Sequence, residues 1–110
     1  MNLDDIPKWL DKDGQEEWKR IVEIIKELQL EDVIDRVMLE GYCQAYSQWI
    51  KAVRWINKYG EVYKTKSGVI KKSPQVEIAD RSMSIIQNFN RHYDLAGRKW
   101  YTIIEKKSIL

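Results

Sequence analysis

The chain has 110 residues, 44% of them hydrophobic and 33% charged, which is typical of one globular domain spanning residues 1–110. No apolar run approaches the roughly 18 residues that a membrane span requires, and the acidic N-terminus lacks the features of a secretory signal, so we expect a cytoplasmic protein with no membrane partner. The charge is uneven, because residues 1–40 carry 6 Lys/Arg and 12 Asp/Glu whereas residues 41–110 carry 13 and 5, and such a basic half attracts polyanions.

The first predicted element is an amphipathic helix, which with a second helix fills about residues 6–60. Asp11 or Asp13 can cap its start. Its apolar residues recur at steps of three and four and therefore share one face: Trp18, Ile21, Val22, Ile25 and Leu28. The segment with Pro7, Trp9 and Leu10 precedes this helix, and we expect Trp9 to fold back onto the apolar face.

The second helix is predicted to run from a cap at Asp32 to Gly60, a residue suited to a left-handed helix stop. At 1.5 Å per residue it would be roughly 40 Å long, more than a compact domain of this size needs. A polar row faces water or a charged surface: Arg36, Glu40, Gln44, Ser47, Lys51, Arg54 and Lys58.

Two other rows of this long helix are apolar or small, and we expect them to contact further copies of the chain. The predicted oligomer interface comprises Met38, Gly41, Tyr42, Ala45, Tyr46, Trp49, Ala52, Val53, Trp55 and Ile56. The alternative is that the chain's own helices cover both rows.

Residues 61–73 are predicted to form a β-hairpin, because Val62–Lys66 faces Val69–Lys72 across Ser67 and Gly68. An isolated two-stranded ribbon is marginal, so we expect it to lean on the helices or on a neighbouring subunit. Its lysines are the predicted DNA-binding residues, with a second patch near the C-terminus: Lys64, Lys66, Lys71, Lys72, Arg98 and Lys99. The alternative is that lysines on exposed strands only discourage aggregation.

A third helix completes the predicted C-terminal part, residues 74–104. Ser73 can cap it, Pro74 suits its first turn, and it continues to about Tyr93. Its inward residues are Val76, Ala79, Met83, Ile86 and Phe89. A turn at 94–97 leads to a helical or extended segment, 98–104, and a loose tail, 105–110. The fold class is therefore mainly α: a helical core with a long central helix, a small β-hairpin and a third helix, oligomerising into a ring.

No residue pattern indicates catalysis. Cys43 is the only cysteine, which excludes an internal disulfide and a cysteine-rich zinc site, and its apolar neighbours predict that it is buried. His92 has no partner at metal-ligand spacing. The phosphate-binding loop, the nucleophile elbow and the His-Glu-x-x-His motif are absent. We therefore predict no catalytic residue, no metal and no cofactor.

The order of features resembles a family of phage terminase small subunits over roughly residues 6–95. The likeness rests on Pro7-x-Trp9-Leu10, on Trp18 and on the run from Asp35 to Trp49, followed by Gly60, the turn at Ser67-Gly68, and Pro74-Gln75-Val76 with Ala79. The C-terminal end departs from the family, whose members continue with Leu-Thr-Pro and a segment rich in serine and arginine. This chain has Leu95-Ala96-Gly97-Arg98-Lys99-Trp100 there.

The resemblance implies a non-catalytic, ring-forming subunit in the host-cell cytoplasm. Such a subunit binds double-stranded viral DNA and presents it to the large terminase subunit, which holds the ATPase and nuclease. A homo-oligomer larger than a dimer follows from the same resemblance and from the two apolar rows of the long helix. Two alternatives remain open at this point: a small helical transcription regulator, and a helical protein-protein interaction module that does not bind DNA.

Overall fold

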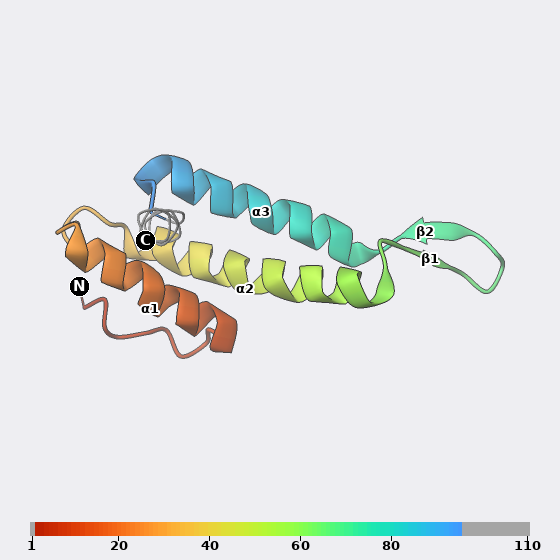
Figure 1. Cartoon of the computed structure of the whole chain (residues 1–110), viewed down its shortest axis with the longest axis horizontal. Helices are drawn as coiled ribbons and strands as arrows, with labels where there is room; N and C mark the ends of the chain where they lie inside the picture. The colour runs from red at the N-terminus through yellow and green to blue at the C-terminus, as the bar shows by residue number, and fades with distance from the viewer. Residues whose placement is uncertain (1, 96–110) are drawn as a thin grey trace, which may run out of the picture.

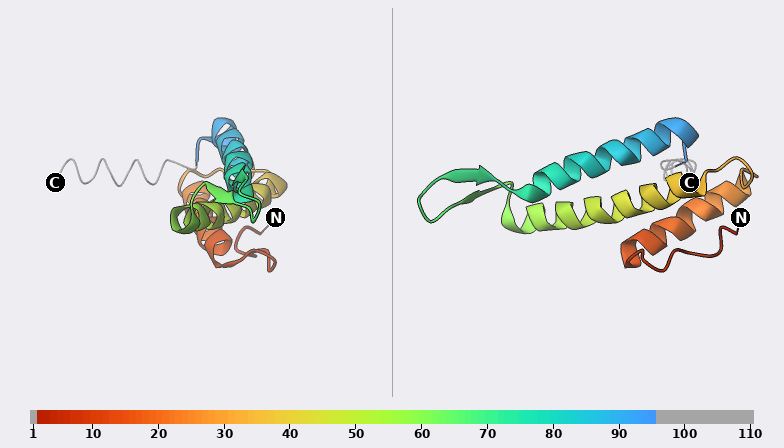
Figure 2. Two further views of the ribbon diagram at one scale, coloured as in Figure 1. Left: turned by 90° about the vertical axis from the view of Figure 1, so that its right-hand side faces the viewer. Right: turned by 180° about the vertical axis from the view of Figure 1, so that it is seen from behind.

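The computed structural model describes residues 2–95, and their elements follow the order α1, α2, β1, β2, α3. The bounds are Lys12–Glu27 for α1, Arg36–Tyr59 for α2, Val62–Lys64 for β1, Ile70–Lys72 for β2 and Pro74–Tyr93 for α3. The long helix α2 lies between α1 and α3, and the hairpin projects beyond the ends of α2 and α3 (Figures 1 and 2). Arg98, Lys99, the segment 98–104 and the tail 105–110 lie outside the described residues.

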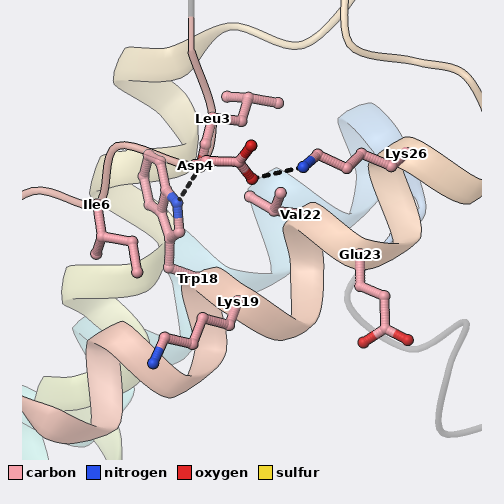
Figure 3. A pocket seen from close by; sticks show the side chains of 8 residues that line it. All are labelled: Leu3, Asp4, Ile6, Trp18, Lys19, Val22, Glu23 and Lys26. Carbon is pink, nitrogen blue, oxygen red and sulfur yellow. Dashed lines mark hydrogen bonds and ion pairs between the residues drawn. The ribbon is translucent and has the colours of Figure 1, made fainter.

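Helix α1 begins as predicted at Asp11, whose side chain accepts a hydrogen bond from the Gly14 amide. The expectation for Trp9 was wrong, because this side chain is 59% exposed. Leu3 and Leu10 are buried in its place, and the Trp18 indole N–H donates to the Leu3 carbonyl at 2.8 Å (Figure 3). The indole thus gains its hydrogen bond from the N-terminal segment, which explains why this segment lies against α1.

Helix α2 begins three residues later than predicted, at a cap formed by Asp35 rather than Asp32. The Asp35 side chain accepts from the Val37 amide, and its own amide donates to the Tyr93 hydroxyl. Between the helices the chain turns with Gln29 at φ 56°, and Ile34 enters the core while Val33 stays exposed. Asp32 and Asp35 are equally suitable cap residues by type. The burial of Ile34 and the hydrogen bond from the Asp35 amide to Tyr93 of α3 therefore determine that Asp35 is the cap.

The core lies where α1, the first part of α2 and the end of α3 meet. Trp18 and Ile21 of α1 and Leu39 of α2 are almost fully buried there. Tyr42 of α2 stacks on Phe89 of α3, with ring centroids 4.4 Å apart. Cys43 is buried, as predicted. Helix α1 lies along the first part of α2, and Asp13 at its start still pairs with Arg54 in the second part. Beyond this point α2 lies beside α3 and continues into the hairpin (Figure 1).

Helix α3 begins at Pro74 and ends at Tyr93, as predicted from the proline and the residue periodicity. Ser73 is the cap residue, but its side chain makes no capping bond and instead donates to Gln75. Phe89 is buried, and the other predicted inward residues are half-buried. The expectation of a mainly helical protein with a small hairpin is therefore confirmed. No helix within residues 2–95 is long and apolar enough to cross a membrane.

Candidate nucleic-acid interface

The hairpin is held away from the helical body by the ends of α2 and α3. Gly60 ends α2 with φ 93°, a conformation that favours glycine, and its amide still donates to the Ile56 carbonyl. At the other end, the Ser73 amide donates to the Glu61 carbonyl at 2.7 Å, which closes the base of the hairpin. All residues of β1 and β2 are exposed, so the ribbon does not lean on the described helices.

The strands pair in a register that a turn made only of Ser67 and Gly68 would not give. Such a turn would place Lys64 opposite Lys71, whereas Lys64 pairs with Ile70 and Tyr63 with Lys71. The loop contains one more residue, because the Thr65 amide donates to the Val69 carbonyl and Gly68 alone takes a positive φ, 89°. A two-residue turn needs positive φ at its first position as well, where Ser67 is unfavourable.

This register divides the hairpin lysines between two faces. Residues paired across an antiparallel ribbon share a face, and alternate residues along a strand also share one. Val62, Lys64, Ile70 and Lys72 therefore form one face, which we call the lysine–valine face. Tyr63 and Lys71 belong to the opposite face, and Lys66 lies in the loop.

The hairpin lysines are clustered and have no acidic partner in the described part of the chain, whereas some cations of the helical body are paired. Lys51 pairs with Asp11 at 2.5 Å, and Arg54 pairs with Asp13 at 3.0 Å. Arg36 donates to the Asn2 and Asp5 carbonyls and also lies over the Trp18 ring. Within residues 2–95, Lys64, Lys66, Lys71 and Lys72 form no ion pair. Their charge is therefore available to a polyanion.

The residues predicted for the oligomer interface have different surroundings in the structure. Tyr42, Ala45 and Ala52 are buried, so the chain's own helices already cover them. Gly41 is exposed, with no atom near the position that a Cβ would occupy. The remaining predicted residues are half-buried: Met38, Tyr46, Trp49, Val53, Trp55 and Ile56. In the predicted polar row, Ser47 is buried, whereas Lys51, Arg54 and Lys58 are exposed as predicted.

The half-buried Trp55 lines a groove of about 330 Å³ between α2 and α3. Lys51 and Ala52 of α2 and Ile78 and Arg81 of α3 also line it. This groove lies on the second part of α2, and its Lys51 is already paired with Asp11, the cap residue of α1. Its half-buried Trp55 and Ile78 leave apolar surface that is available to another protein.

Comparison with known proteins identifies the family. The chain matches the family described as phage terminase, small subunit, over residues 14–99. The chain belongs to the phage terminase small-subunit family. Members of this family are not catalytic; they bind DNA and recruit the large terminase subunit for packaging. No curated protein and no solved structure matches the chain.

Metal-binding side chains do not cluster in the described part of this terminase small subunit. Within residues 2–95, no three His, Cys, Asp or Glu side chains lie where they could hold a metal ion. Burial raises the pKa of the Cys43 thiol well above its usual range, which makes this thiol a poor nucleophile.

A buried polar cluster that was not among the predictions from the sequence joins α1 to α2. Glu17 is 3% exposed, accepts two hydrogen bonds of 2.6 Å from Arg20, and accepts another from the Tyr42 hydroxyl. Burial and the neighbouring Glu17 carboxylate raise the pKa of Tyr42 above its usual range, so this hydroxyl stays a donor. The signal was present, because Glu17 precedes Ile21 by four residues and thus belongs to the buried side of α1.

A second polar cluster lies around the cap of α1 in the small subunit. Asp11 accepts from the Ser47 hydroxyl of α2 at 2.6 Å and pairs with Lys51. The hydrogen bonds from Lys51, Ser47 and the Gly14 amide lower the pKa of Asp11 to about 2. The Asp11 carboxylate thus caps α1 and also binds α1 to α2, the helix that leads into the hairpin.

Proposed function

We propose that this small subunit binds viral DNA through the lysines of its projecting hairpin and delivers the DNA to the large terminase subunit. The observation that carries the proposal is the clustering of four unpaired lysines on the projecting hairpin. Among residues 2–95, four exposed lysines without acidic partners lie within nine positions on one projecting ribbon, whereas the unpaired cations of the body, such as Lys8, Lys19 and Arg91, are spread over separate elements. Lysine ammonium groups on flexible stems suit phosphates, so the binding is weakly sequence-selective.

The proposal includes assembly into a closed homo-oligomer larger than a dimer. The half-buried apolar residues of α2 and the groove at Trp55 support it, because they leave apolar surface that the described chain does not cover. A contact between two different surfaces, repeated by rotation, closes a ring. Such an assembly multiplies the hairpins that contact one DNA molecule, so a modest affinity per hairpin becomes a tight overall affinity.

The experiment measures DNA affinity against salt concentration for the variant Lys64→Ala/Lys66→Ala/Lys71→Ala/Lys72→Ala. The slope of log affinity against log salt should flatten by up to about 0.9 for each phosphate that the variant no longer neutralises. Because all four side chains are exposed, the variant should keep the parent's mass in solution and its helix content.

A matched control removes four other exposed cations: Lys8, Lys12, Lys19 and Arg91. It lowers the net charge by the same amount but leaves the hairpin intact. We expect the control to keep most of the salt slope. If the hairpin variant keeps the parent's slope, or if the control loses as much slope as the hairpin variant, the hairpin is not the DNA surface.

A further inference from the structure

We propose that the hairpin enters the major groove of DNA as a two-stranded ribbon, with its lysine–valine face toward the base pairs. This inference rests on the proposed function, since it concerns how the same hairpin contacts DNA. It adds direct contacts between apolar side chains and base edges to the phosphate contacts of the lysines.

The first observation is that the hairpin is apolar as well as basic. Five of the ten large hydrophobic side chains that are exposed within residues 2–95 lie between residues 59 and 70: Tyr59, Val62, Tyr63, Val69 and Ile70. Ile70 is 69% exposed and Val62 is 56% exposed. Contacts to phosphates alone do not require these apolar side chains, because phosphate oxygens are contacted by charged and hydrogen-bonding groups.

The second observation is that charge distinguishes the two faces. Lys64 and Lys72 both belong to the lysine–valine face, and no acidic residue shares it. The opposite face carries Lys71, and Glu61, which directly precedes β1 and whose carbonyl accepts from the Ser73 amide, continues the alternation on that side. The lysine–valine face is therefore the more positive of the two, so it is the face that the phosphates on both sides of a groove attract.

The third observation is that the width and residue spacing of the hairpin match those of the DNA major groove. A ribbon of two strands is about 5 Å wide between its backbones and fits a major groove about 12 Å wide. Residues two apart on a strand are separated by about 6.8 Å, which is close to two base-pair steps. Val62 and Ile70 lie diagonally on this face, each opposite a lysine. Their methyl groups can contact thymine methyl groups while the lysines reach guanine edges or phosphates.

Charge complementarity selects DNA over a protein as the occupant of this face. Each apolar side chain of the face is paired with a lysine that has no acidic partner within residues 2–95. DNA supplies methyl groups in the groove and phosphates along both of its edges, so it satisfies both kinds of side chain at once.

The test combines a protein change with a DNA change. Val62→Thr/Ile70→Thr keeps β-branched side chains, and therefore the ribbon, but removes apolar methyl groups from the lysine–valine face. Tyr63→Thr is the matched control on the opposite face. Each protein is titrated with a short mixed-sequence duplex and with the same duplex containing deoxyuridine in place of thymidine, which lacks only the thymine methyl groups.

The parent protein should bind the uracil duplex about fourfold more weakly for each thymine methyl group that its hairpin contacts. Val62→Thr/Ile70→Thr should bind the thymine duplex about tenfold more weakly than the parent, with an unchanged salt slope. On the uracil duplex this variant and the parent should differ little, because the partner methyl groups are already gone. Tyr63→Thr should discriminate between the duplexes as the parent does.

Three results would overturn the inference. Equal binding of Val62→Thr/Ile70→Thr and the parent to the thymine duplex means that the hairpin contacts phosphates alone, provided that the lysine variant still flattens the salt slope. A greater loss with Tyr63→Thr means that the opposite face enters the groove. Unchanged DNA binding with loss of large-subunit recruitment means that the lysine–valine face contacts protein. Failure of the proposed function is distinct, since there the lysine variant itself keeps the parent's slope.

Discussion

The buried carboxylate of Glu17 is the point at which α1 and α2 are most sensitive to substitution. It forms an ion pair with Arg20, whose side chain is 29% exposed, and accepts a hydrogen bond from the Tyr42 hydroxyl. The Tyr42 ring in turn stacks on Phe89 of α3. Three helices therefore depend on one side chain. Glu17→Ala removes the carboxylate, so Arg20 loses its ion pair and the Tyr42 hydroxyl loses its acceptor.

The expected loss of unfolding free energy for Glu17→Ala is about 3 kcal/mol. Breaking a buried ion pair costs about 3–5 kcal/mol, but Arg20 is partly exposed and can turn toward water, which reduces this contribution. The buried Tyr42 hydroxyl loses the acceptor of its proton, which costs about 1–3 kcal/mol. Tyr42→Phe should cost only about 1 kcal/mol, because Glu17 keeps both hydrogen bonds from Arg20.

Urea denaturation followed by circular dichroism measures these losses at one fixed protein concentration, since assembly itself adds stability. Glu16→Ala, an exposed neighbour on the same helix, is the control and should change stability by about 0.5 kcal/mol or less. The double variant Glu17→Ala/Tyr42→Phe should lose less than the sum of the single losses. A Glu17→Ala loss no larger than that of Glu16→Ala, or strict additivity, would refute the reasoning.

Asp11→Ala should lower stability at pH 7 by about 1 kcal/mol, less than the roughly 2.4 kcal/mol that the full pKa shift implies, because the side chain is 35% exposed. The lowered pKa of Asp11 stabilises the fold above about pH 4, and this stabilisation is lost as the carboxylate is protonated between pH 4 and pH 2. The difference in unfolding free energy between the parent and Asp11→Ala, measured by urea titration, should therefore shrink over this pH range, and a constant difference would contradict this. Trp55→Ala should reduce the mass measured by light scattering, whereas Trp9→Ala, on the exposed N-terminal segment, should not. A monomeric or dimeric parent, or equal masses for both variants, would count against assembly through α2.

The sequence was sufficient to predict the helix ends at which a single residue determines the backbone conformation. Asp11 starts α1, Gly60 ends α2, and Pro74 starts α3, because a side-chain acceptor, a positive φ and a fixed φ each act within a few residues. Asp32 shows the limit of this reasoning. It is as good a cap by composition as Asp35, and contacts with distant residues decide between them.

Tertiary contacts explain the remaining differences. Ser47 belongs to a polar row of α2, yet it is buried, because Asp11 at the cap of α1 accepts a hydrogen bond from its hydroxyl. Ala45 and Ala52 looked suited to contacts between subunits, but α3 lies against this part of α2 and they are buried. A charged substitution at either alanine would therefore unfold the chain rather than test assembly. In the hairpin, one extra loop residue changed which lysines share a face, which composition alone does not specify.

Photo-crosslinking from the hairpin tests the central claim most directly. Cys43 is buried and its thiol pKa is raised, so a cysteine introduced at Lys66 is the thiol that a crosslinking reagent modifies. The comparison is between Lys66→Cys and Lys19→Cys, which replaces an exposed lysine of α1, each bound to duplex DNA without the large subunit. DNA contact through the hairpin predicts a much higher crosslinking yield from position 66. A yield from position 19 that equals or exceeds it would contradict the account.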